Sequence, residues 1–451
     1  MDTRIEQNNI SNNHQDPQII VKKRPQRKRR TYADDDDGVQ TCNIGTQVKE
    51  GHPNYPMMYD MLTGIRIGVG RVSAKRLRPL KESDFTAAHK LVFDITGNEL
   101  TPGVKYDFKF KDYAPWVFRH LREKFHVDSS DYMMSLTSKY ILSEIGSPGK
   151  SGSFFYYSRD YRFIIKTIHH SEHKFMIKIL KQYYEHVCNN SNTLLCRFYG
   201  LHRIKMPRGR KIHFVVMGNI MPPNKDIHQK YDLKGSLFGR YSHIDTEEDE
   251  RSKVRKDQNW LQENQQLELG PIKRDLLLQQ ITIDVEFLKA HNIMDYSLFI
   301  GIHDLTKGNR EGLKSLHMVS PSTTSRHSND SAELVREAVK NSNYVQVNLS
   351  HLPAQPSEER LLCIFYADEG GFRSTDQNNQ PSDKLYYFGI IDILTPYNFI
   401  KKSEHFWKRI TQDKQTISAV PPIFYGNRFM TFMKKAIMNR FSNPTLNIKE
   451  V

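Results

Sequence analysis

The chain has 451 residues, in which 66 Lys and Arg outnumber 51 Asp and Glu to give a formal net charge of +15. This length allows one large two-lobed domain or two ordinary ones, and the charge favours an anionic partner such as a nucleic acid, a lipid surface or a nucleotide. The four cysteines lie far apart without a Cys-x-x-Cys pair, which excludes a disulfide framework and a zinc knuckle and favours a reducing, intracellular location. The apolar runs are too short to cross a bilayer, so any membrane contact is expected to be peripheral.

Residues 1–48 are predicted to form a disordered tail, because they are rich in Asn, Gln and charge. A basic run at 22–30 is followed by four consecutive aspartates at 34–37. Three interpretations of the run stay open: a solvated tail, a nuclear-import signal, and a clamp for anionic lipid.

From residue 49 the composition becomes that of a folded domain, which we expect to extend over 49–451. Residues 83–92 and 116–125 are predicted to be helical. The polar stretch 305–360 contains few aromatic residues and is expected to be a disordered insertion that splits the domain without ending it.

A glycine-rich turn at 147–153 precedes two aromatic and β-branched runs, 154–157 and 161–166, which predict a β-hairpin. Strand alternation places Lys166 on the same face as Arg162 and Ile164, where its amine can face a phosphate held under the turn. A Walker A loop is excluded because Glu144 stands at the position of the first glycine and strands follow the turn. The candidate phosphate-binding residues are Gly149, Lys150, Ser151, Gly152, Ser153 and Lys166.

Residues 171–187 predict an amphipathic helix with Ser171 as its N-cap. Glu172 lies in its first turn. Two roles stay open for this glutamate: an ion pair that orients Lys166, and a favourable interaction with the helix dipole.

Two separated aspartates complete the pattern of a phosphotransferase. A predicted helix over 273–291 is followed by Asp295 and the apolar strand 298–302, so Asp295 is placed like a catalytic-loop aspartate. A second apolar strand, 386–391, ends at Asp392, which is placed like a magnesium-binding aspartate.

Three motifs resemble the signatures of the phosphatidylinositol phosphate kinases: DLKGS at 232–236, MDYSL at 294–298 and IID at 390–392. The resemblance runs from about residue 51 to the end of the chain and is greatest to the fungal type I phosphatidylinositol-4-phosphate 5-kinases. Gly218 and Phe299 depart from the usual pattern of the family without removing a charge.

The resemblance implies ATP and Mg²⁺ as cofactors. Lys166 is then expected to bind the ATP phosphates, Asp392 the magnesium ion, and Asp295 to lie beside the attacking hydroxyl, with Lys234 supporting the phosphate region. Adenine is expected against residues 216–219, with Met217 and Asn219 as its contacts.

The segment 393–425 is expected to be the activation or specificity loop. Its residues 398–410 mix aromatic and basic side chains, a composition that suits a membrane interface and also suits a helix packed on its own domain. By resemblance, Lys401 and Lys402 engage the lipid, and Glu404 marks the enzymes that take phosphatidylinositol 4-phosphate and phosphorylate its 5-hydroxyl.

The expected fold is α+β and kinase-like, with two lobes: an amino lobe with an antiparallel sheet and a smaller carboxyl lobe. The expected reaction converts phosphatidylinositol 4-phosphate in anionic membranes to phosphatidylinositol 4,5-bisphosphate. The alternatives are a protein serine/threonine kinase and a catalytically silent phosphoinositide-binding scaffold. Specific nucleic-acid binding is not expected, because no motif of a nucleic-acid fold accompanies the charge.

The family resemblance further implies a homodimer formed through residues 51–72. It also implies a cytoplasmic protein, peripheral at the inner face of the plasma membrane. A nuclear location stays open because of the basic tail.

Overall fold

The computed structural model describes the parts of the chain that surround the expected site. The described residues are 46–48, 50–97, 103–104, 106–137, 142–145, 153–206, 209, 211–309, 363–397 and 420–437. Most of the expected tail and insertion lies outside them, as do Gly149, Lys150, Ser151, Gly152, Lys401, Lys402 and Glu404.

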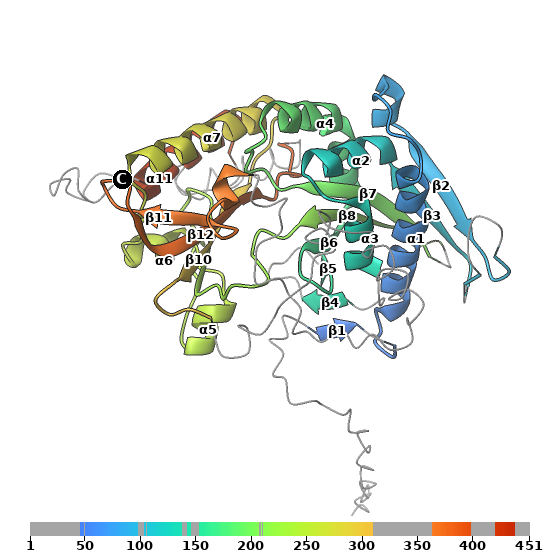
Figure 1. Ribbon diagram of the computed structural model, residues 1–451, viewed down its shortest axis with the longest axis horizontal. Coiled ribbons are helices and arrows are strands. Elements are labelled where there is room, and N and C mark those ends of the chain that lie inside the picture. The colour runs from blue at the N-terminus through green and yellow to red at the C-terminus, as the bar shows by residue number, and fades with distance from the viewer. Residues whose placement is uncertain are drawn as a thin grey trace, which may run out of the picture. The chain divides into compact units, whose positions relative to one another are not determined.

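The amino-terminal sheet has eight antiparallel strands in the order β1-β4-β5-β6-β8-β7-β3-β2 (Figure 1). Its strands are β1 (Thr46–Val48), β2 (Ala88–Phe93), β3 (Phe108–Tyr113), β4 (Leu142–Ile145), β5 (Phe155–Tyr157), β6 (Phe163–Ile168), β7 (Phe198–Lys205) and β8 (Lys211–Gly218). The predicted hairpin is confirmed as β5 and β6, and Lys166 lies in β6, where it pairs with Phe155.

Helices α1 (Tyr55–Ser73) and α2 (Pro115–Lys124) pack on this sheet, α1 against β3 and α2 against β7. Phe110 lies between Lys109 and Lys111 along β3, and it is buried together with Leu91 of β2 and Phe214 of β8. Gly64 lets α1 approach β3 closely, because a Cβ atom there would stand 2.0 Å from the ring of Phe110. Two further helices, α3 (Ser129–Thr137) and α4 (His170–Asn189), complete this part of the fold.

Helix α2 confirms the predicted helix at 116–125, but the prediction for 83–92 was wrong. There the chain forms the short 3₁₀ helix η1 (Glu82–Phe85) and then β2. Leu91 and Phe93 are buried while Lys90 and Val92 are exposed, a period of two that pairing with β3 stabilises. Helix α4 also begins before its predicted start: its N-cap is His169, so Ser171 lies inside the first turn.

The carboxy-terminal sheet has four antiparallel strands in the order β11-β12-β10-β9. Its strands are β9 (Gln229–Leu233), β10 (Ser297–Asp304), β11 (Phe372–Thr375) and β12 (Pro381–Ile391). The helices of this part of the chain are α5 (Glu247–Ser252), α6 (Asp257–Gln262), α7 (Pro271–Ala290), the 3₁₀ helix η6 (Ile364–Tyr366) and α11 (Pro422–Ile437). Helices α7 and α11 pack side by side (Figure 1). The α+β class with antiparallel sheets is thus confirmed, and the two sheets are compatible with the expected two lobes.

The ends of the two expected loops belong to this folded part. Leu305 donates a backbone hydrogen bond to Asp383, and the side chain of Asn309 accepts one from Asp226. Helix α11 begins at Pro422, so the last residues of the segment 393–425 are helical. No helix among the described residues has the length and hydropathy needed to span a bilayer.

A short segment between α4 and β7 joins the two sheets. The amide of Ile390 in β12 donates to Leu194 at 2.7 Å, and the amide of Cys196 donates back to Ile390 at 2.9 Å. Beneath this contact, the fully buried carboxylate of Asp284 in α7 accepts hydrogen bonds from the Thr193 hydroxyl at 2.7 Å and from the Leu194 amide at 2.8 Å.

The same carboxylate lies 2.7 Å from Nε2 of His186 in α4. Asp284 therefore connects a helix of the carboxyl lobe to a helix of the amino lobe.

Substituting Asp284→Ala is expected to lower the free energy of unfolding by about 3 kcal/mol, because several buried donors lose their acceptor together. Urea denaturation followed by circular dichroism measures this change. The control is Asp275→Ala in the same helix, whose side chain is 71% exposed and whose loss should cost less than about 0.5 kcal/mol. Equal stability of the two variants would contradict the connecting role of Asp284.

Candidate active site

The register of the carboxy-terminal sheet brings three candidate residues to one edge. Leu233 pairs with Leu298, and Ser297 pairs with Ile391. Lys234 directly follows β9, Asp295 lies two residues before β10, and Asp392 directly follows β12. Because neighbouring strands are antiparallel, the end of β9, the start of β10 and the end of β12 lie at the same edge.

Two lysine–aspartate pairs form at this edge. Nζ of Lys166 lies 2.9 Å from Oδ1 of Asp392, so the hairpin of the amino-terminal sheet reaches the carboxy-terminal sheet. Nζ of Lys234 donates to the backbone carbonyl of Asp295 at 2.6 Å and to its Oδ1 at 3.0 Å. Four of the residues selected from the sequence are therefore brought together in space.

The electrostatics of the first pair keep both partners charged. Burial alone would raise the pKa of Asp392, but the charge and hydrogen bond of Lys166 and the charge of Lys234 lower it below its ordinary value. Burial opposes the charged form of Lys166 as well, and Asp392 together with Glu172 nevertheless raises its pKa. The Asp392 side chain stays 42% exposed, so an incoming group can reach its carboxylate.

Both aspartates have left-handed backbone conformations, with φ of 64° at Asp295 and 61° at Asp392. Such a conformation costs ~1–3 kcal/mol and is typical of functional loops. The two loops brace each other: the amide of Met294 donates to Thr395 at 3.1 Å, and that of Tyr397 donates to Asn292 at 2.9 Å. The backbone therefore sets the direction of each Cα–Cβ bond, and the paired lysines hold the carboxylates.

Asp257 was not selected from the sequence, yet it organises the loop after β9. Its side chain is fully buried and accepts hydrogen bonds from the amides of Lys234 at 2.9 Å and Gly235 at 2.7 Å, and from Nε of Arg240 at 2.7 Å. Gly235 has φ of +68°, and a Cβ atom there would stand 3.1 Å from the Cα atom of Phe429 in α11. These contacts explain why the motif at 232–236 contains a glycine after its lysine.

Two further candidate residues for nucleotide binding, Ser153 and Met217, lie in the amino-terminal part of the fold. Ser153 is buried beside Phe154, whose amide donates to the side chain of Thr167. Met217 lies in β8 between Ile164 of β6 and Phe198 of β7.

Asn219 and Glu172 both stabilise local backbone. The side chain of Asn219 donates to the carbonyl of Tyr161, a residue with φ of 57° in the hairpin turn, at 2.8 Å. The carboxylate of Glu172 accepts from the amide of His169 at 2.7 Å and so caps α4, while its charge still acts on Lys166.

Two antiparallel sheets of unequal size, joined where a strand lysine meets an aspartate at the end of a buried strand, define a kinase-like fold. A model of the phosphatidylinositol-4-phosphate 5-kinase family matches residues 136–436. The chain belongs to this family.

Relatives from three groups of organisms are similar over most of the chain. Phosphatidylinositol 4-phosphate 5-kinase its3 of Schizosaccharomyces pombe is 53% identical over 444 residues, which cover 95% of this chain and 58% of that protein. Phosphatidylinositol 4-phosphate 5-kinase 1 of Arabidopsis thaliana is 36% identical, covering 87% and 54%. A probable phosphatidylinositol phosphate kinase of Dictyostelium discoideum is 36% identical, covering 87% and 59%. The chain thus spans a little over half the length of these relatives.

A double-mutant cycle tests whether Asp257 and Arg240 act as a unit. Asp257→Ala is expected to lower the free energy of unfolding by about 3–5 kcal/mol, because two backbone amides lose their buried acceptor and the mostly buried guanidinium of Arg240 keeps only Asp232 as a carboxylate partner. Adding Arg240→Ala to that variant should cost clearly less than it does in the wild type. Strictly additive losses, measured by urea denaturation, would contradict the coupling.

Proposed function

We propose that the protein is an ATP-dependent lipid kinase that phosphorylates the 5-hydroxyl of phosphatidylinositol 4-phosphate and forms phosphatidylinositol 4,5-bisphosphate. The observation that supports this function best is the meeting of the Lys166–Asp392 and Lys234–Asp295 pairs at one edge of a sheet. Phosphoryl transfer needs these groups close together: a lysine for the phosphates and separate carboxylates for metal and hydroxyl. The names of the two 5-kinase relatives support the substrate and the position of transfer.

In this proposal Lys166 holds the ATP phosphates. Its amine is now paired with Asp392, and a phosphate oxygen is a stronger charged partner for an ammonium group than a single carboxylate oxygen. The glycine turn that contains Gly149, Lys150, Ser151, Gly152 and Ser153 would cover the same phosphates with backbone amides. Adenine would lie near Met217 and Asn219 at the end of β8.

The carboxylates at the edge suit magnesium. Mg²⁺ prefers oxygen ligands, and the carboxylate of Asp392 is partly exposed and kept ionised by its lowered pKa. When bound there, the ion would neutralise charge that develops on the transferred phosphoryl group. Asp392 is therefore the residue proposed to hold it.

Asp295 would orient the attacking hydroxyl and accept its proton. Its side chain is 31% exposed, and Lys234 holds both its carbonyl and its carboxylate, which fixes the carboxylate for one approach direction. Lys234 also adds positive charge near Asp392. Catalysis would thus depend on alignment and on electrostatic stabilisation rather than on a covalent intermediate.

A row of basic residues across the amino-terminal sheet supports an anionic membrane as partner. Lys90 pairs with Lys111, and Lys111 pairs with Arg203 on the next strand, so like charges stand directly opposite each other. This arrangement is unfavourable without an anionic partner, and burial together with the charges of Arg203 and Lys90 lowers the pKa of Lys111.

A second basic row runs through Lys109, Lys205 and Lys211. Each lysine or arginine near an anionic leaflet adds about 1 kcal/mol of attraction. We place this face against the inner leaflet of the plasma membrane, together with Lys401 and Lys402 of the specificity loop. Glu404 would select the 4-phosphate, and residues 51–72, which include most of α1, would join two copies of the chain.

The first test offers the purified protein labelled ATP, magnesium and vesicles that contain phosphatidylinositol, its 4-phosphate or its 5-phosphate. Only the 4-phosphate is expected to be converted, and its product should be the 4,5-bisphosphate. Asp392→Asn should lower the rate by at least about 100-fold while remaining folded, because the residue proposed to hold the metal loses its charge. Asp275→Asn, at an exposed position in α7, is the matched control and should keep the wild-type rate.

Other outcomes would separate the alternatives. Preference for the 5-phosphate would contradict the role of Glu404. Phosphorylation of peptides but not lipids would indicate a protein kinase, and vesicle binding without consumption of ATP would indicate a scaffold. Full activity of a folded Asp392→Asn protein would contradict the proposed site.

A further inference from the structure

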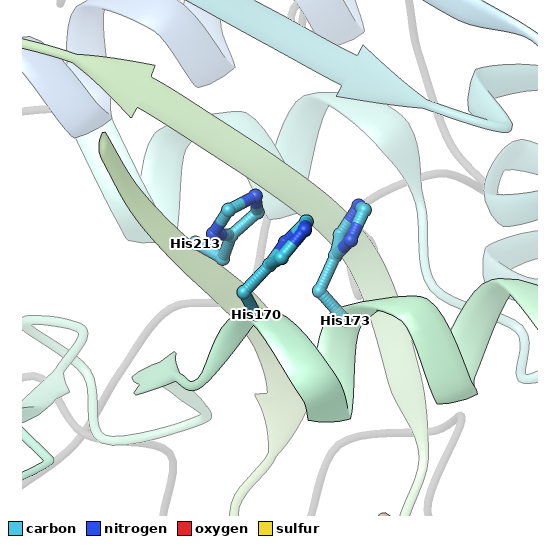
Figure 2. Close-up of side chains that lie close together, drawn as sticks. All are labelled: His170, His173 and His213. Atoms are coloured by element: carbon cyan, nitrogen blue, oxygen red, sulfur yellow. The ribbon is translucent and has the colours of Figure 1, made fainter.

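A cluster of three histidines lies between α4 and β8, apart from the two lysine–aspartate pairs. His170 and His173 lie three residues apart on α4, and His213 lies on β8 (Figure 2). One ring nitrogen from each can be chosen so that all three lie within 4.8 Å of one another. Figure 2 shows the rings gathered in the space between the helix and the strand.

His173 is the most unusual member of the cluster. Its side chain is only 7% exposed, and neither ring nitrogen has a hydrogen-bond partner among the described residues. A buried imidazole normally satisfies at least one nitrogen. The ring packs against Tyr113 in a T-shaped arrangement, with ring centroids 4.3 Å apart, and its centroid lies 4.5 Å from that of the His213 ring.

The buried rings are in the protonation state that a metal requires. Burial, together with neighbouring positive charge, lowers the pKa of His173 to about 4 and that of His213 to about 3. Both are therefore neutral at pH 7, with a lone pair available for coordination. His170 is exposed, so its ring can move toward the other two.

The surroundings restrict which ion can bind. A cavity of about 500 Å³ is lined by His170 and His213 and also by Arg203 and Lys211, without a carboxylate among its lining residues. Hard cations such as Mg²⁺ and Ca²⁺ prefer oxygen ligands, above all carboxylates, and no carboxylate lines this cavity. Imidazole nitrogens suit Zn²⁺ and similar transition metals, and a three-histidine set leaves one position open.

We propose that His170, His173 and His213 bind one Zn²⁺-like transition-metal ion, whose fourth position faces the cavity and takes an anion held near Arg203 and Lys211. With bonds of about 2.1 Å, the nitrogens of a tetrahedral site stand roughly 3.4 Å apart. A rotation of the exposed His170 ring brings the cluster toward that spacing. The ion would tie the start of α4 to β8, next to the strand that contains Lys166.

The test uses the full chain, freed of metal with a chelator and kept in excess Mg²⁺ so that carboxylate sites are occupied. Calorimetric titration with Zn²⁺ should show one ion per chain, and Co²⁺ should give the visible absorption of a tetrahedral site with nitrogen ligands. His170→Ala should weaken Zn²⁺ binding by at least about tenfold and abolish the Zn²⁺-dependent rise in melting temperature. Because His170 is exposed, this variant is expected to fold.

His243→Ala is the control, since it removes an exposed histidine that is outside the cluster and does not line the cavity. Its affinity for Zn²⁺ should stay within about twofold of the wild-type affinity, whereas loss of a metal ligand should weaken binding by at least about tenfold. Equal binding by the His170→Ala protein, or absence of binding by the wild type, would overturn the proposal. Binding of inorganic phosphate by the metal-free protein without any binding of Zn²⁺ would also overturn it and indicate an anion pocket.

Discussion

The backbone hydrogen bonds between Ile390 and the segment from Leu194 to Cys196 are the constraint on which the rest of the site depends. They attach the central strand β12 of one sheet to the chain that enters β7 of the other. Asp392 follows Ile390 by two residues, so a shift in this junction would move the carboxylate away from Lys166. Asp284 of α7 stabilises the junction, because its buried carboxylate accepts hydrogen bonds from Thr193 and Leu194 of the same segment.

Around that junction, the backbone and the paired lysines together determine where the charges point. Asp295 and Asp392 both have positive φ, and adjacent backbone hydrogen bonds hold their loops together. The strain of two such residues is offset by the buried strands on either side. A site built in this way needs little rearrangement when its partners bind, which suits a reaction that depends on alignment.

Charge is distributed unevenly over the molecule. The edge of the carboxy-terminal sheet pairs each lysine with an aspartate, whereas β2, β3 and β7 place Lys90, Lys111 and Arg203 beside one another. In each lysine–aspartate pair, a metal ion can replace the lysine as partner of the aspartate, and a phosphate can replace the aspartate as partner of the lysine. The rows of basic residues instead favour binding to an extended anionic surface. The histidine cluster differs from both, because its buried rings are neutral near pH 7.

The sequence by itself determined those parts of the structure that depend on local pattern. Alternating aromatic and β-branched residues placed Lys166 on a strand, and helical periodicity predicted α2 and α7. Local pattern failed at residues 83–92, where pairing with β3 outweighed helical propensity, and at the start of α4, where His169 rather than Ser171 is the N-cap. The order of the motifs selected the four charged residues of the site but not their pairing.

Only the tertiary structure decided which lysine meets which aspartate, because that depends on strand register and on the docking of two sheets. It alone revealed Asp257, whose hydrogen-bond donors lie 17 to 23 residues away along the chain. It also revealed the cluster that His213 completes across two elements. Contacts between residues distant in sequence leave no local periodicity from which they can be predicted.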